Sequence, residues 1–181
     1  NASGNGFWRT HHDDELMDNL LAHLGELEPI ERYLVVDDTW ADLLAGRVEV
    51  SRVVEVCEAM TDDRHPAVWR RLGGVFGGLR RLIANDHLDQ FQAWVRSVSF
   101  VALEDAARLA HDGDAAAQDL YAVLFGIAGV TGADPATQQA ARELLAADPA
   151  KVDANLLASA TGVVAADASA AEHRDLMARW R

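Results

Sequence analysis

Apolar residues recur every three or four positions from Asp13 to the end of the chain, the spacing of one face of an α-helix. Leu16, Leu20, Leu24 and Leu27 form the first such run. Comparable runs predict further helices within residues 34–44, 53–60, 68–83, 88–109, 120–130, 144–145, 156–164 and 176–180. The run 120–130 is apolar on nearly every side, so we expect it to lie centrally. The pattern therefore predicts about nine helices with short loops between them.

Proline and glycine mark where these helices should begin and end. Proline is tolerated in the first turn, because the N–H that it lacks would be unpaired there. The four prolines at expected helix starts are Pro29, Pro66, Pro135 and Pro149. The expected N-cap residues are Ser51, Asp86, Asp134 and Asp148. The glycines at expected helix ends are Gly25, Gly46 and Gly113.

Short loops force neighbouring helices to run antiparallel. Pairing the helices in order places pair starts near residues 13, 51 and 86, at intervals of 38 and 35 residues. These intervals are close to the period of HEAT and armadillo arrays, about 40 residues. We therefore predict an all-α fold of antiparallel helix pairs in a HEAT- or armadillo-like curved repeat array. A helix bundle remains the alternative.

The first ten residues do not follow the helical pattern. Gly4 and Gly6 are typical of a turn, and residues 7–10 form a short strand-like run. The sequence offers this run no partner strand, and a lone strand leaves its backbone groups unpaired. The segment is therefore either a loop or part of a sheet that lies elsewhere.

The charge balance excludes some classes of partner. Lys and Arg number 16 and Asp and Glu number 29, which gives a net charge of −13. This charge disfavours binding to nucleic acid and to anionic lipid. The longest uncharged stretch, residues 120–133, is 14 residues long, short of the roughly 20 needed to span a bilayer. We expect no nucleic-acid or membrane partner and, without a secretory signal, a cytoplasmic location.

Candidate chemical groups are few. Residues 11–14, His-His-Asp-Asp, are the most metal-like cluster, but adjacent side chains point apart, so we expect a loop leading into an acidic helix start. Asp37 and Asp38 could form an acid–base pair, although a structural role as ion pair or buried hydrogen-bond acceptor is favoured, with Arg32 five or six residues earlier. Cys57, the single cysteine, falls on an apolar face and is expected to be buried and inert. We assign no catalytic residue and no metal ligand.

Residues 73–78, Gly-Gly-Val-Phe-Gly-Gly, lie within an expected helix, where glycine is unfavourable. The spacing places Gly73 with Gly77 and Gly74 with Gly78 on one side of that helix. Close approach of a neighbouring helix is the favoured explanation, and a kink is the alternative.

Two stretches resemble zinc aminopeptidases of the aminopeptidase N type, a family that includes membrane alanyl and endoplasmic reticulum aminopeptidase-like enzymes. They are residues 1–13, NASGNGFWRTHHD, and residues 31–47, ERYLVVDDTWADLLAGR; the start of the helix at 66–69 is also similar. The resemblance implies that residues 1–12 end a preceding β-sandwich domain or form a linker. It implies that residues 13–181 are the C-terminal helical-repeat domain, truncated at its C-terminal end. Phe7, Trp8 and Arg9 would then be possible interdomain contacts.

The family binds zinc through a His-Glu-x-x-His motif in its catalytic domain, and this chain has no such motif. The resemblance therefore implies a fragment without cofactor or activity of its own, and a parent enzyme that uses zinc to remove N-terminal residues from peptides. In that parent the helical domain would cover the active site and shape the peptide chamber. Its partners would be the parent's own catalytic domain and the peptide substrates. A stand-alone HEAT-like protein-interaction module and an acidic helical enzyme with an unrecognised site are the alternatives.

Overall fold

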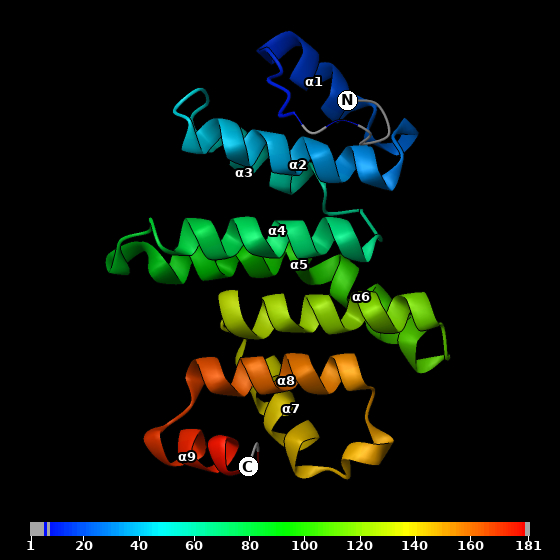
Figure 1. The fold of residues 1–181 in the computed structure, drawn as a ribbon, viewed down its shortest axis with the longest axis vertical. Coiled ribbons are helices and arrows are strands. Elements are labelled where there is room, and N and C mark those ends of the chain that lie inside the picture. Colours follow the sequence, from blue (N-terminus) through cyan, green and yellow to red (C-terminus); the bar gives the residue numbers. More distant parts are fainter. Residues whose placement is uncertain (1–5, 7, 180–181) are drawn as a thin grey trace. The chain divides into compact units, whose positions relative to one another are not determined.

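The computed structural model describes residue 6 and residues 8–179, and within them it contains helices and no strand (Figure 1). The α-helices are α1 (Asp14–Ala22), α2 (Pro29–Leu44), α3 (Val50–Ala59), α4 (Pro66–Arg80), α5 (Leu88–His111), α6 (Ala115–Gly126), α7 (Pro135–Ala146), α8 (Ala154–Asp167) and α9 (Ala170–Arg179). Short 3-10 turns occupy Leu24–Glu26, Asn85–His87 and Pro149–Lys151, and a π-helical turn, Ile127–Thr131, continues α6. The predicted all-α class is confirmed.

The predicted starts are confirmed where an aspartate N-cap directly precedes a proline. α7 begins at Pro135, and the Asp134 carboxylate accepts a hydrogen bond from the Thr137 backbone N–H at 2.8 Å. Asp148 caps Pro149 in the same way, although that element is only a three-residue 3-10 turn. The remaining prolines, Pro29 and Pro66, begin α2 and α4.

Other predicted ends were wrong by a few residues. Ser51 does not cap α3, because that helix already begins at Val50 with Glu49 as the N-cap residue. Asp86 lies inside the 3-10 turn that precedes α5. Gly25 lies in a second 3-10 turn, since α1 ends earlier, at Ala22.

Two of the predicted glycine stops are confirmed by backbone geometry. Gly46 has φ +68° just after α2, and Gly113 has φ +90° just after α5. Left-handed backbone is strained for residues with a Cβ, so glycine ends these helices at low cost.

The chain divides into two compact units, Asn1–Val75 and Phe76–Arg181. In the first unit α2 packs on α3, and the buried side chains include Val53, Val56 and Trp69. Arg52 of α3 holds α1, because its guanidinium lies 2.9 Å from the Asp14 carboxylate and 2.7 Å from that of Asp18. Cys57 is fully buried, and burial raises the pKa of its thiol to about 12, so the prediction of a buried cysteine is confirmed.

In the second unit α5 packs on α6, and α8 lies against both α6 and α7 (Figure 1). A cluster of fully or nearly fully buried side chains joins α6, α7 and α8; it consists of Phe125, Ala141, Ala160, Val163 and Val164. The predicted central place of residues 120–130 agrees with this packing. The curved repeat array remains a prediction, as does a domain division near residue 12.

The predicted close helix crossing in α4 is wrong at two of its glycines. A Cβ added at Gly77 would meet no described atom within 4 Å, and one at Gly74 would meet only the Arg71 guanidinium, at 3.2 Å. The close crossing lies instead in the second unit, where a Cβ at Gly129 would come within 2.6 Å of Val163 in α8.

No single helix among the described residues is long and apolar enough to cross a bilayer. Two consecutive segments, Ala115–Thr131 and Pro135–Ala146, are together long and apolar enough for a membrane span, but they are bent by 119° relative to each other.

Candidate functional site

The groups singled out in the sequence belong to the first unit, and most have structural roles. Asp13 is the N-cap residue of α1, and its carboxylate accepts from the Leu16 N–H at 2.8 Å. His12 is half-buried, and burial lowers its pKa although Asp38 and Asp42 lie nearby. No group of three or more His, Cys, Asp or Glu side chains in the described ranges could hold a metal ion. Residues 11–13 have no regular secondary structure and lead into α1, whose first turn carries Asp14 and Glu15, so the loop interpretation is confirmed by the fold.

Arg32, the nearest arginine in the sequence, does not pair with Asp37 or Asp38. The Arg32 Nε donates instead to the Asp63 carboxylate at 2.5 Å, across to the turn before α4. Asp37 accepts from the Nε of Arg71, at 2.6 Å, and from Arg9. The two aspartates therefore serve as ion-pair acceptors, as expected, but with partners distant in the sequence.

The residues expected at a domain boundary have different surroundings. Trp8 is 65% exposed, whereas the Arg9 side chain lies against α2. Phe7 lies outside the described residues. An interdomain role for Trp8 and Arg9 remains a prediction.

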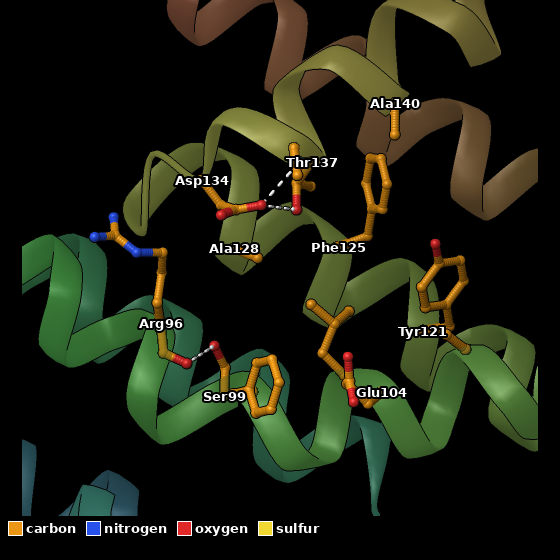
Figure 2. Close-up of a pocket in the computed structure, with 13 residues that line it drawn as sticks. Arg96, Ser99, Glu104, Tyr121, Phe125, Ala128, Asp134, Thr137 and Ala140 are labelled. Atoms are coloured by element: carbon orange, nitrogen blue, oxygen red, sulfur yellow. Dashed lines mark hydrogen bonds between the residues drawn. The ribbon is translucent and has the colours of Figure 1, made fainter.

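A groove in the second unit is the strongest candidate for a binding site. It lies between α5, α6 and α7 and has a volume of about 440 Å³ (Figure 2). Its lining is mainly apolar and consists of Arg96, Ser99, Phe100, Leu103, Glu104, Ala107, Tyr121, Phe125, Ala128, Asp134, Ala136, Thr137 and Ala140. The sequence did not predict this groove.

One end of the groove is built by the π-helical turn after α6. Gly132 and Ala133 follow this turn, and Ala133 has the left-handed φ of 45°. Arg96 of α5 donates to the carbonyl oxygen of Gly132, which fixes the turn against α5. Asp134 then caps α7 and accepts from the Thr137 hydroxyl at 2.7 Å (Figure 2). These contacts make this end of the groove polar and well defined.

The aromatic wall of the groove comes from α6. Tyr121 and Phe125 are four residues apart, so they project from one face of the helix, and their rings meet edge to face with centroids 5.8 Å apart. Burial raises the pKa of the Tyr121 hydroxyl. Phe100 on α5 is 55% exposed although it is a large apolar side chain. An exposed phenylalanine facing an apolar hollow is typical of a surface that binds another molecule.

A second hollow, of about 480 Å³, shares Ala107 and Tyr121 with the groove. Its other lining residues include His111 and Lys151, the single lysine of the chain. The two hollows therefore meet at Ala107 and Tyr121, and the second is the more polar of the two.

The groove carries no catalytic arrangement among its lining residues. The Ser99 hydroxyl donates to the Val95 carbonyl oxygen at 2.8 Å, within its own helix, and no histidine lines the groove beside it. A nucleophile needs an adjacent base, so the geometry favours binding over chemistry. Arg96 has no carboxylate within ion-pair distance in the described part, so the polar end of the groove carries both its guanidinium and the Asp134 carboxylate.

Comparisons with known proteins agree with the helical architecture. No solved structure matches the chain. A family described as the ERAP1-like C-terminal domain matches residues 1–181, the whole of the sequence. The chain therefore belongs to the ERAP1-like C-terminal domain family, the C-terminal helical domain of aminopeptidases of the aminopeptidase N type.

Proposed function

We propose that this domain covers the active site of its parent enzyme, a cytoplasmic zinc aminopeptidase that removes N-terminal residues from peptides, and shapes the chamber that holds the peptide. The parent's catalytic domain would supply the zinc and all groups that act on the peptide bond. The family membership supports a place beside that domain. The groove between α5, α6 and α7 is the observation that carries the proposal.

The lining of the groove suits part of a peptide. Phe100, Tyr121 and Phe125 offer apolar and aromatic area for a side chain. Burying one large apolar side chain stabilises a complex by about 1.5–3 kcal/mol before the costs of ordering it. A long peptide could reach this surface while its N-terminus lies at the zinc site, whereas a dipeptide could not.

A stand-alone interaction module remains the alternative, and the family match disfavours it. The two hypotheses differ in what lies upstream in the parent gene. A His-Glu-x-x-His helix there would decide for the aminopeptidase.

The proposal predicts that Phe100→Asp in the parent enzyme selectively impairs long peptides. A charge in the apolar groove should lower kcat/KM about tenfold for a peptide of about ten residues, because one apolar contact is lost. The rate on a dipeptide reporter should stay within about twofold. Phe100 is exposed, so the substitution leaves no cavity in the core.

Leu82→Asp is the matched control. Leu82 is 68% exposed in the turn after α4 and does not line the groove. It should leave both rates unchanged. Equal effects of Phe100→Asp on both substrates, or no effect on either, would argue against the chamber role.

A further inference from the structure

Residues 8–13, here called the strap, run along α2 without regular secondary structure. Arg9 donates to the Asp37 carboxylate and, at 3.2 Å, to the Asp37 carbonyl oxygen. Its guanidinium also lies 3.7 Å from Asp38. Two residues further along, the Nδ1 of His11 lies 2.7 Å from the Asp42 carboxylate. The strap thus meets three acidic side chains on one helix.

These acidic side chains are buried more deeply than their partners. The side chains of Asp38 and Asp42 are 3% and 6% exposed, whereas those of Arg9 and His11 are 55% and 49% exposed. Buried carboxylates are costly unless they are paired and hydrogen-bonded. The strap therefore supplies ion-pair and hydrogen-bond partners to a row of poorly exposed carboxylates on α2.

The same acidic row also holds other parts of the first unit. Asp37 pairs with Arg71 of α4, and Asp42 with Arg47 of the α2–α3 turn at 3.2 Å. Each of these two carboxylates contacts one side chain of the strap, Arg9 or His11, and one arginine of the helical body. The helical contacts can therefore persist when the strap leaves.

Apolar packing contributes little to holding the strap. Trp8 is largely exposed, and the Thr10 hydroxyl oxygen is buried and has no hydrogen-bond partner among the described residues. Beneath the strap lies a hollow of about 140 Å³, lined by Thr10, His12 and Asp38 among others. A segment that buries an unpaired hydroxyl over a hollow is not packed like a core element.

We propose that residues 8–13 form a releasable electrostatic latch, closed by Arg9 and His11 on the Asp37–Asp38–Asp42 row, which fixes the chain entering the domain to α2. The latch opens without unfolding the helices. In the parent enzyme it would decide whether the junction with the preceding domain moves together with the first helices. This inference does not depend on the proposed chamber role.

Trypsin cleavage after Arg9 tests the latch in the 181-residue chain. Trypsin must take the Arg9 guanidinium into its own specificity pocket, so cleavage requires the ion pairs with Asp37 and Asp38 to break. Cleavage after Arg81, which is exposed in the turn after α4, provides an internal reference. We expect wild-type protein to be cut after Arg9 more slowly than after Arg81.

Asp37→Asn and Asp42→Asn weaken the latch and leave the sequence around the Arg9–Thr10 bond unchanged. Each should raise the ratio of Arg9 to Arg81 cleavage about five- to tenfold, with helical circular dichroism unchanged. Asp18→Asn, which removes an exposed partner of Arg52, is the control and should leave the ratio unchanged. A wild-type ratio near one, or folded variants with no increase, would overturn the latch.

The salt dependence of trypsin cleavage provides a second test of the latch, and it needs no variant. Raising the salt from about 10 mM to about 1 M shortens the Debye length from ~30 to ~3 Å and weakens ion pairs that solvent reaches, as it reaches the half-exposed Arg9 side chain. The ratio of Arg9 to Arg81 cleavage in wild-type protein should rise severalfold. A ratio that does not change with salt would contradict an electrostatic latch, even if the aspartate variants failed to fold.

Discussion

Trp69→Ala is expected to lower the free energy of unfolding by about 3–5 kcal/mol, the largest effect of any single change considered for this chain. Trp69 is fully buried at the start of α4, and its Nε1 donates to the Asp63 carbonyl oxygen at 2.8 Å. Truncation would leave a large cavity and remove one of two hydrogen bonds to the Asp63 carbonyl oxygen, which also accepts from the Arg64 guanidinium at 3.0 Å. The turn at Asp63 would lose its hydrogen bond to α4, although its carboxylate would still accept from Arg32 and from the His65 backbone N–H that precedes α4.

Trp8→Ala is the matched control, because it removes the same side chain from an exposed position. Trp8 is 65% exposed, so its loss should change stability by no more than about 0.5 kcal/mol. Urea unfolding followed by circular dichroism measures both values. If the two substitutions cost the same, the burial assigned to Trp69 is incorrect.

Gly129→Ala is expected to cost about 1–3 kcal/mol, although alanine favours helix. An added Cβ would lie 2.6 Å from both methyl groups of Val163 and 3.1 Å from that of Thr137. Val163 is itself fully buried in α8, so it cannot move aside without disturbing the core. The small residue is needed because the π-helical turn and α8 approach so closely.

Gly126→Ala, one helical turn earlier, is the comparison. There a Cβ would lie 3.7 Å from the Ser159 hydroxyl, an ordinary contact. The substitution should be neutral or should stabilise the chain by up to about 1 kcal/mol, because alanine loses less backbone entropy than glycine. Thermal unfolding of both variants gives the answer. If the Gly129→Ala variant were as stable as the Gly126→Ala variant, the prediction that Val163 leaves no space for a Cβ at Gly129 would be wrong.

Features that depend on neighbouring residues could be predicted from the sequence. Pro135 after Asp134 begins a helix because the fixed φ of proline and the capping carboxylate act within one turn. Gly46 and Gly113 end helices because their backbone is left-handed. The apolar spacing of three and four predicted most helices for the same local reason.

Features that depend on tertiary contacts could not be predicted from the sequence. Asp37 has partners 28 and 34 residues away, Arg9 and Arg71, and does not pair with Arg32, the nearest arginine in the sequence. The groove arises only where α5, α6 and α7 meet. In the sequence its aromatic residues lie in apolar runs that are typical of ordinary core positions. In the structure the exposed Phe100 marks the groove, but a sequence does not show which apolar side chains are exposed.

The measurement that tests the central claim most directly is photo-crosslinking in the parent enzyme. A peptide of about ten residues, which extends over ~30 Å, would carry a photoreactive side chain near its C-terminal end. If this domain lines the peptide chamber, the label will be recovered on peptides containing Phe100, Tyr121 or Phe125, and an unlabelled long peptide will compete with it. Recovery of the label from the catalytic domain alone would contradict the account.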